Sequence, residues 1–272
     1  SCDACPTDIP GCTDPDAVNY DPAATSDDGS CVNPDPDANN LFISEYIEGS
    51  SSNKALEIYN PSDHTIDLTG VEFWRISNGG DWTEGEGNAV SLEGYSLASD
   101  DVFVICNADI AEEYSGECDV IGGNLNEATY FNGDDAMGLA YAGVLIDAVG
   151  EAGDDPGSGW DVAGVTNATK EHTLVRNGDI TSGNTDWASS AGTNADDSEW
   201  TIHDQNTFDN LGSHVEDEPP NFTNSITATG GGQSLTMNFG FSPDATDGYD
   251  DGLDVYAPPA PPSPAFDVAR LQ

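Results

Sequence analysis

Two groups of carboxylates are the residues whose types and spacing best fit a chemical task, the binding of divalent cations. Calcium takes about six to eight oxygen ligands, which clusters of Asp and Asn with interspersed Gly can supply. The first group lies between two cysteines that would hold it in one compact loop: Asp14, Asp16, Asn19, Asp21, Asp27 and Asp28. The second group is spaced by turn-forming glycines: Asp244, Asp247, Asp250, Asp251 and Asp254. We predict calcium at both groups, although a solvated acidic linker is the alternative explanation of the first.

Other acidic residues are open to a structural explanation. Residues 132–135 most simply form a tight turn between strands, with calcium binding as the alternative. Glu45, Glu48 and Glu57 lie in a strand-like region, where structural hydrogen bonding explains them as well as a metal does.

The sequence lacks the common catalytic motifs. It contains no nucleophile elbow, phosphate-binding loop or zinc-protease helix, and its four His residues lie far apart. We interpret His64 and His172 as surface or structural residues. Trp74 is expected in the core, and the other four Trp are expected to cover loops and not to form a carbohydrate platform. We therefore predict that the protein is not an enzyme.

The charge of the chain excludes whole classes of partner. Its 272 residues include 51 Asp and Glu against 5 Lys and Arg, a formal net charge of -46. Nucleic acid and anionic membranes both require basic groups, so neither partner is expected. Self-repulsion on this scale destabilises a compact state unless salt or bound cations neutralise it. Either a saline habitat or discrete calcium sites would provide those cations, and both explanations stay open.

Cysteine usage points outside the cytosol. The six cysteines show no clear metal-site spacing, there are two Asn-x-Thr acceptors, at Asn167 and Asn221, and no apolar run is long enough to span a membrane. An extracellular or cell-surface protein is expected. We expect two local disulfides, Cys12 with Cys31 and Cys106 with Cys118, while Cys2 and Cys5 pair with each other or link to another chain. The alternative to disulfides among the first four cysteines is that they bind zinc.

Short apolar runs with little helical periodicity dominate from residue 41 onward. Each run is β-branched or aromatic and is bounded by Gly, Asn, Asp or Pro: residues 41–47, 55–59, 71–76, 102–106, 136–140, 144–149 and 172–176. This pattern predicts an all-β, immunoglobulin-like antiparallel β-sandwich. One helical turn is expected at residues 108–114.

Composition divides the chain into five parts. A Cys- and Asp-rich segment covers residues 1–32, a semi-rigid linker 33–40, the β-sandwich 41–215 and a second linker 216–220. The last part, residues 221–272, contains a hairpin-like pair of strands, an Asp-rich loop and a Pro-rich arm. It is too small for its own core. We expect it to pack on the sandwich, to continue into further residues or to be completed by another subunit.

Three stretches resemble known families. The run from Phe42-Ile-Ser-Glu-Tyr-Ile47 to Leu56-Glu-Ile-Tyr-Asn-Pro61, with Ile66-Asp-Leu-Thr-Gly70, resembles the bacterial lamin-tail domain, and the resemblance extends over about residues 41–215. It implies an immunoglobulin-like sandwich that is generally accessory and carries no catalytic residues; in secreted nucleases it sits beside the enzyme domain. Residues 11–31 resemble a Cys-bounded acidic repeat of secreted bacterial surface proteins, itself similar to thrombospondin type 3 calcium repeats. Residues 247–259 resemble a segment near the ends of exported bacterial proteins.

These resemblances imply export, binding and assembly. We expect a secreted structural or adhesion protein, associated with calcium, that forms a homo-oligomer, fibre or surface matrix by exchanging a strand or arm between subunits. A tail strand that pairs with an exposed sheet edge satisfies its own backbone and caps that edge. The alternative is a non-catalytic targeting or carbohydrate-binding module of a larger exported enzyme, with glycans as partners.

Overall fold

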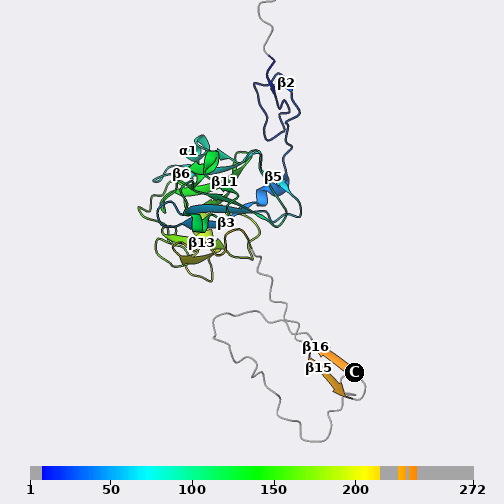
Figure 1. Ribbon diagram of the computed structural model, residues 1–272, viewed down its shortest axis with the longest axis vertical. Helices are drawn as coiled ribbons and strands as arrows, with labels where there is room; N and C mark the ends of the chain where they lie inside the picture. The colour runs from blue at the N-terminus through cyan, green and yellow to red at the C-terminus, as the bar shows by residue number, and fades with distance from the viewer. Residues whose placement is uncertain (1–7, 215–225, 231–232, 238–272) are drawn as a thin grey trace, which may run out of the picture. The chain divides into compact units, whose positions relative to one another are not determined.

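The computed structural model of the chain describes residues 8–214, 226–230 and 233–237 (Figure 1). The chain divides into two compact units, Ser1–Asp217 and Glu218–Gln272. Among the described residues, no helix has both the length and the apolar character needed to cross a bilayer.

Two β-sheets form the body of the first unit. The six-stranded sheet has the order β10-β9-β4-β3-β13-β14, and the four-stranded sheet has the order β12-β11-β6-β7. The strands of the larger sheet are β3 (Phe42–Glu48), β4 (Lys54–Tyr59), β9 (Val102–Cys106), β10 (Val120–Ile121), β13 (His172–Arg176) and β14 (Trp200–Asp204). Those of the smaller sheet are β6 (Val71–Ile76), β7 (Val90–Ser91), β11 (Ala136–Tyr141) and β12 (Val144–Val149).

The pairing within these sheets is antiparallel with one exception. β10 runs parallel to β9, with Val120 opposite Ile105. The structure is mostly β with antiparallel sheets, as predicted, and the short parallel edge strand is a departure from the prediction. Residues 107–119 form a loop after β9, and the Cys106–Cys118 disulfide holds the end of this loop beside the end of β9. The chain therefore enters β10 next to β9 and in the same direction.

Short elements connect the strands. β5 (Ile66–Asp67) pairs with β8 (Ser96–Leu97), and two short α-helices are present, α1 (Trp82–Gly87) and α2 (Trp187–Ala191). Three 3-10 helices complete the set, η1 (Pro36–Asn40), η2 (Glu112–Tyr114) and η3 (Gly123–Thr129). The helical turn predicted at residues 108–114 is confined to η2. The segment predicted as a linker contains η1, in which Ala38 is fully buried.

The core lies between the two sheets, and a second apolar cluster covers the outer face of the larger one. Side chains alternate across a strand, so Leu56 and Ile58 of β4 join the core while Ala55 and Tyr59 face outward. Leu211 packs on the outward side. Every residue of β3 and β4 is consequently buried, as expected for strands covered on both faces.

The tryptophans contribute to this interior. Trp74 is buried as predicted, and Trp160, Trp187 and Trp200 are each less than a tenth exposed. Trp82 packs against the core from its edge.

The segment that precedes the sandwich has little regular structure. β1 (Pro10–Gly11) pairs in parallel with β2 (Ser26–Asp27), and a disulfide joins Cys12 to Cys31. Both predicted local disulfides are therefore present. Cys2 and Cys5 lie outside the described residues.

In the second unit, β15 (Ile226–Gly230) pairs antiparallel with β16 (Gln233–Met237), which is the predicted hairpin. The second linker, the Asp-rich loop and the Pro-rich arm lie outside the described residues, and so do the predicted calcium ligands Asp244, Asp247, Asp250, Asp251 and Asp254.

Candidate metal centre

Four of the five carboxylates between Cys12 and Cys31 cap turns of their own loop, and the fifth, Asp16, donates its backbone N–H to Asp14. In each of the four, one Oδ1 atom accepts a hydrogen bond from the backbone N–H two residues later, which is the geometry of an Asx turn. The acceptors and donors are Asp14 and Asp16, Asp21 and Ala23, Asp27 and Gly29, and Asp28 and Ser30, at 2.8 to 3.0 Å. The hydrogen bonds from Ser30 lower the pKa of Asp28 below its ordinary value. These side chains thus shape the loop whether or not they bind an ion.

Asn19 has a different part in the same loop. Its Nδ2 donates to the Ser30 carbonyl at 2.7 Å, and its Oδ1 accepts from the Val32 N–H at 2.9 Å. Both ends of the amide therefore hold the chain on either side of Cys31. Asn19 acts as a clamp, and its oxygen is already engaged by a donor.

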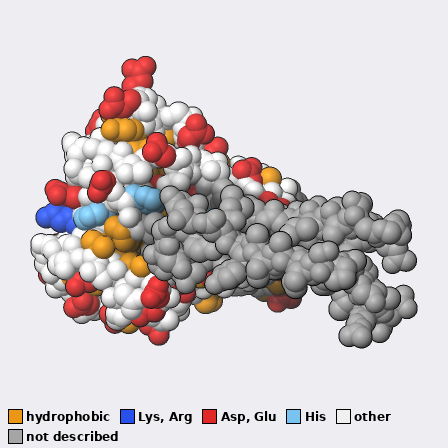
Figure 2. Space-filling view, turned by 90° about the horizontal axis from the view of Figure 1, so that it is seen from below, with side chains coloured by type: hydrophobic (Ala, Val, Ile, Leu, Met, Phe, Trp, Pro, Cys, Tyr) orange, Lys and Arg blue, Asp and Glu red, His pale blue; other side chains and the backbone are white. Residues whose placement is uncertain are grey.

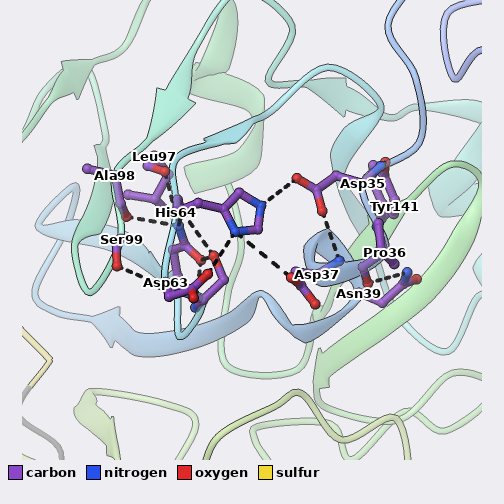
Figure 3. A network of polar contacts seen from close by, with 12 residues as sticks. Asp35, Pro36, Asp37, Asn39, Asp63, His64, Leu97, Ala98, Ser99 and Tyr141 are labelled. Atoms are coloured by element: carbon purple, nitrogen blue, oxygen red, sulfur yellow. Dashed lines mark hydrogen bonds and ion pairs between the residues drawn. The ribbon is translucent and has the colours of Figure 1, made fainter.

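One other group is arranged as a metal site would be. Within residues 8–214, the one set of three carboxylate, imidazole or thiolate ligand atoms that all lie within 4.8 Å of one another belongs to Asp35, Asp37 and His64. The predicted ligands between Cys12 and Cys31 are not brought together in this way. Figure 3 shows the His64 imidazole facing the carboxylates of Asp35 and Asp37.

The two aspartates are positioned by η1. Asp35 is its N-cap, accepting the Asp37 N–H at 3.0 Å, and Pro36 takes the first helical position, where a missing N–H costs nothing. The backbone N–H of Asp35 donates to the Tyr141 hydroxyl at 2.7 Å. The spacing Asp-x-Asp thereby places both carboxylates on the side of the turn that meets His64.

His64 is fixed by a buried amide. The Asn60 side chain, itself fully buried, donates through Nδ2 to the carbonyls of His64, Leu97 and Ala98. These three hydrogen bonds fix the loop between β4 and β5, which carries His64. Nε2 of His64 lies 2.9 Å from Asp35, and Nδ1 lies 3.3 Å from Asp63 and 3.9 Å from Asp37.

The surrounding carboxylates favour the charged imidazole. The pKa of His64 is raised above its ordinary value, first by the hydrogen bond to Asp35 and then by that to Asp63. A metal ion needs the neutral ring as ligand, so proton and metal compete for this site.

The donor set selects a class of ion. Imidazole nitrogen with carboxylate oxygen suits zinc or another first-row divalent ion, whereas calcium prefers oxygen ligands alone. This group is therefore distinct from the predicted calcium sites. His64 lies at the surface, as the sequence interpretation placed it. Its proximity to Asp35 and Asp37 was not predicted, because these residues are remote in sequence; the Asp-x-Asp spacing is the signal that was available.

Hydrogen bonds within the fold hold two other acidic candidates, the turn at residues 132–135 and Glu48. At residues 132–135, the Asp135 N–H donates to the Asn132 carbonyl and the Asn132 N–H donates to the Asp135 carboxylate, which closes the predicted turn. Glu48 bonds Lys54 at 2.5 Å and the Glu171 N–H. Structural hydrogen bonding thus explains Glu48.

Two of the four Lys and Arg residues in the described part of the chain, Lys54 and Arg176, are buried. Arg176 is 1% exposed and bonds Asp147 at 2.5 Å and Glu199 at 2.6 Å. Its guanidinium also lies over the Trp200 ring, 4.0 Å from the centroid. Lys54 is equally enclosed, since its ammonium donates to Glu48 and to the Phe131 carbonyl.

Comparison with known proteins identifies part of the chain. No curated protein matches the sequence. Among solved structures, a DUF4876 family protein from Bacteroides thetaiotaomicron VPI-5482 is similar at 14% identity and a TM-score of 0.35, over 65% of this chain and 72% of that chain. The family model of the Lamin Tail Domain matches residues 34–153. That match begins inside the predicted linker and ends before β13 and β14. Residues 34–153 of the chain are therefore similar to the Lamin Tail Domain.

Proposed function

We propose that this chain is a secreted, non-catalytic structural or adhesion protein whose folded state depends on cations and which self-associates through strand pairing. The observation that carries the proposal is the burial of its bases. Of the four Lys and Arg residues within the described part, Lys54 and Arg176 are enclosed with acidic partners, which leaves Arg75 and Lys170 to offset the exposed carboxylates.

Most charged side chains at the surface are therefore acidic. Figure 2 shows Asp and Glu spread over one face, with Lys or Arg at its margin. Arg75 is itself paired with Glu127 at 3.8 Å, and Lys170 is exposed. Repulsion among the carboxylates opposes the compact state, and cations that bind or accumulate at the surface relieve it. Calcium, which favours carboxylate oxygens, is the ion we assign to the loop between Cys12 and Cys31.

Export is supported by two disulfides, Cys12–Cys31 and Cys106–Cys118. Such bonds persist in oxidising surroundings and are rare in the cytosol. A non-catalytic role is supported by the match to a domain that is generally an accessory module.

Self-association is supported by the hairpin of the second unit. β15 and β16 form a sheet of two strands, each with an outer edge, and such a sheet is marginally stable by itself. Pairing with the edge of a sheet in another subunit would satisfy those backbone groups. A contact of this kind that does not close on itself produces a filament.

The cation and assembly halves of the proposal are tested separately. Calorimetric melting of the full chain across a calcium titration at fixed high sodium chloride is expected to show a rise in melting temperature. An unchanged melting temperature would show that cations act only through general ionic screening and would refute the calcium sites. Electron microscopy with calcium, then with chelator, is expected to show filaments or oligomers, which a chain ending at residue 214 should not form. Dispersed monomers of the full chain in both conditions would refute assembly.

A further inference from the structure

Two glutamates face each other in the middle of the larger sheet. Glu45 of β3 is the register partner of Glu57 of β4. Val175 of β13 lies beyond Glu45, and Val104 of β9 lies beyond Glu57. Like charges directly opposite in neighbouring strands repel, and apolar neighbours on both sides leave the repulsion unscreened.

Both side chains are covered. Each glutamate is 1% exposed, although both lie on the outer face of the sheet. Residues 207–214, which we call the strap, cross this face. Leu211 is buried there among Tyr59, Val102 and Val104.

Glu57 is supplied with hydrogen-bond donors and Glu45 is not. The Ser44 hydroxyl donates to Glu57 Oε1 and the Gly212 N–H of the strap donates to Oε2, both at 2.7 Å. Neither carboxyl oxygen of Glu45 has a partner among the described residues. A buried carboxylate without a donor is strongly disfavoured, so Glu45 must hold either a proton or a cation.

Within residues 8–214, no ion pair joins a Lys or Arg to Glu45 or Glu57. Asp119 accepts the Val104 N–H, and Glu117 lies against Gly212, so both add negative charge. The His214 ring packs on Phe42 and Tyr59. Arg176 lies over Phe42 at 5.7 Å but is engaged with Asp147 and Glu199. Val175 and Val104, the flanking residues on β13 and β9, are uncharged.

A cation fits this place poorly. Calcium needs about six to eight oxygens, and within residues 8–214 no third carboxylate, imidazole or thiolate converges with Glu45 and Glu57. A proton needs no further ligand. When Glu45 is protonated, its carboxyl group is neutral and the repulsion between the two side chains is removed.

We propose that Glu45 is held protonated opposite Glu57 and that this pair acts as a pH-dependent latch that keeps the strap on the sheet. With Glu45 protonated, Glu57 accepts the Gly212 N–H and the strap covers the outer face. When that proton is lost, two carboxylates oppose each other in an apolar site. Lifting the strap then hydrates them and uncovers the apolar cluster.

The acid strengths agree with this geometry. Burial, followed by the charge of Glu57, raises the pKa of Glu45 to about 9. Burial raises the pKa of Glu57 to about 7, against the lowering effect of its two donors. A carboxyl whose pKa is raised by folding contributes stability that is complete below its unfolded pKa of about 4.3 and is lost as the pH rises through its folded pKa. The strap is therefore held most firmly in mild acid and is released in alkali.

Carbon-13 NMR of the glutamate carboxyls in the full chain, at high sodium chloride with chelator, tests the proposal directly. We expect Glu45 to remain protonated at neutral pH and to ionise in the alkaline range. Ionisation of Glu45 near its ordinary pKa would overturn the latch. Protonation that disappears when calcium is added would also overturn it, by assigning a cation to the pair.

Three chains compared by urea denaturation at several pH values test the energetic part. Glu45→Gln keeps the size of the side chain and cannot ionise. Glu93→Gln, at an exposed position, removes a carboxylate from the surface. Between about pH 5 and 9, the unfolding constant of the wild type should rise relative to that of Glu45→Gln by up to tenfold per pH unit. Glu93→Gln should follow the wild type. Parallel curves for all three chains would refute the latch.

Hydrogen exchange at Gly212 reports on the strap itself. In the wild type, protection of this amide should decrease through the alkaline range by more than protection of amides in β4. Protection in Glu45→Gln should persist there. Loss of protection at the same pH in both chains would separate strap opening from the pair and contradict the proposal.

Discussion

The segment between Cys12 and Cys31 and the β-sandwich solve the same electrostatic problem in opposite ways. In the segment, exposed carboxylates are satisfied locally by backbone N–H groups two residues away, and a disulfide supplies the closure. In the sandwich, acidic groups are taken inside and matched over long sequence distances, as Asp147 is with Arg176. The apolar core there provides the main stabilisation.

This difference indicates where each region is vulnerable. Local turns make almost no use of sequence-distant residues, so the segment depends on its covalent link and on solvent cations. A buried ion pair is set by the fold and cannot be replaced by salt, since removal of one partner leaves the other charge in an apolar site.

Removal of the buried guanidinium should have the largest effect. Arg176→Met leaves Asp147 buried with its charge uncompensated, so we expect a loss of about 3–5 kcal/mol in the free energy of unfolding. Urea denaturation followed by tryptophan fluorescence measures it. Arg75→Met, at a partly exposed pair, should lose no more than about 1 kcal/mol. Equal losses of unfolding free energy in the two variants would contradict the proposed difference between buried and exposed ion pairs.

Removal of the first disulfide should affect the segment alone. Cys12→Ser combined with Cys31→Ser releases a loop closure worth about 3 kcal/mol, so amide protection in residues 8–32 should collapse while the sandwich retains its melting temperature. The matched pair Cys106→Ser with Cys118→Ser should instead lower the melting of the sandwich. A drop in sandwich stability from the first pair would show that the two regions depend on each other.

Loss of the Asn19 clamp should have a smaller local effect. Asn19→Ala removes two hydrogen bonds beside Cys31, and we expect about 1–2 kcal/mol of destabilisation confined to the segment. Amide exchange at Val32 measures it. Asn39→Ala, which removes one exposed bond to Pro36, is the control and should be nearly neutral. If Asn19 serves chiefly as a calcium ligand, the variant would instead differ from wild type only when calcium is present.

The exposed group at His64 should show the smallest effect on stability and a distinctive pH dependence. Because the pKa of His64 is raised, its ion pair with Asp35 stabilises the fold below the unfolded value of about 6.5 and is lost as the pH rises through the folded pKa. Metal binding has the opposite sign, since it requires the neutral ring. Cobalt(II) absorbance should therefore increase with pH, and His64→Gln should abolish it while His172→Gln should not. Binding that survives His64→Gln would place the metal elsewhere.

The strands were accessible from the sequence because alternation and β-branched runs are local signals. Residues 71–76 were predicted as a strand and form β6, and the runs at 102–106 and 172–176 form β9 and β13 with the same bounds. The 3-10 helix η1 was missed, because an Asp- and Pro-rich stretch resembles a linker until Ala38 is seen to be buried. β14 was also missed, since Thr201 and Asp204 interrupt its apolar pattern.

The candidate sites were accessible to a lesser degree. Asx turns and the disulfides follow from nearby residues, so the loop between Cys12 and Cys31 could be outlined. The Asp35, Asp37 and His64 group depends on where η1 meets the loop between β4 and β5, and the Glu45 and Glu57 pair depends on the register of β3 and β4. That information is not contained in the spacing of a single chain segment.

The acidity of the protein, its long apolar strands and its local disulfides were predictable from the chain, because charge, alternation and short loop closures involve residues that are close in sequence. Which charges are exposed and which are enclosed depends on the packing of distant segments. Arg176 meets Asp147, and Glu45 meets Glu57, through strand register and packing, and burial gives those contacts their strength by excluding the water that would otherwise screen them.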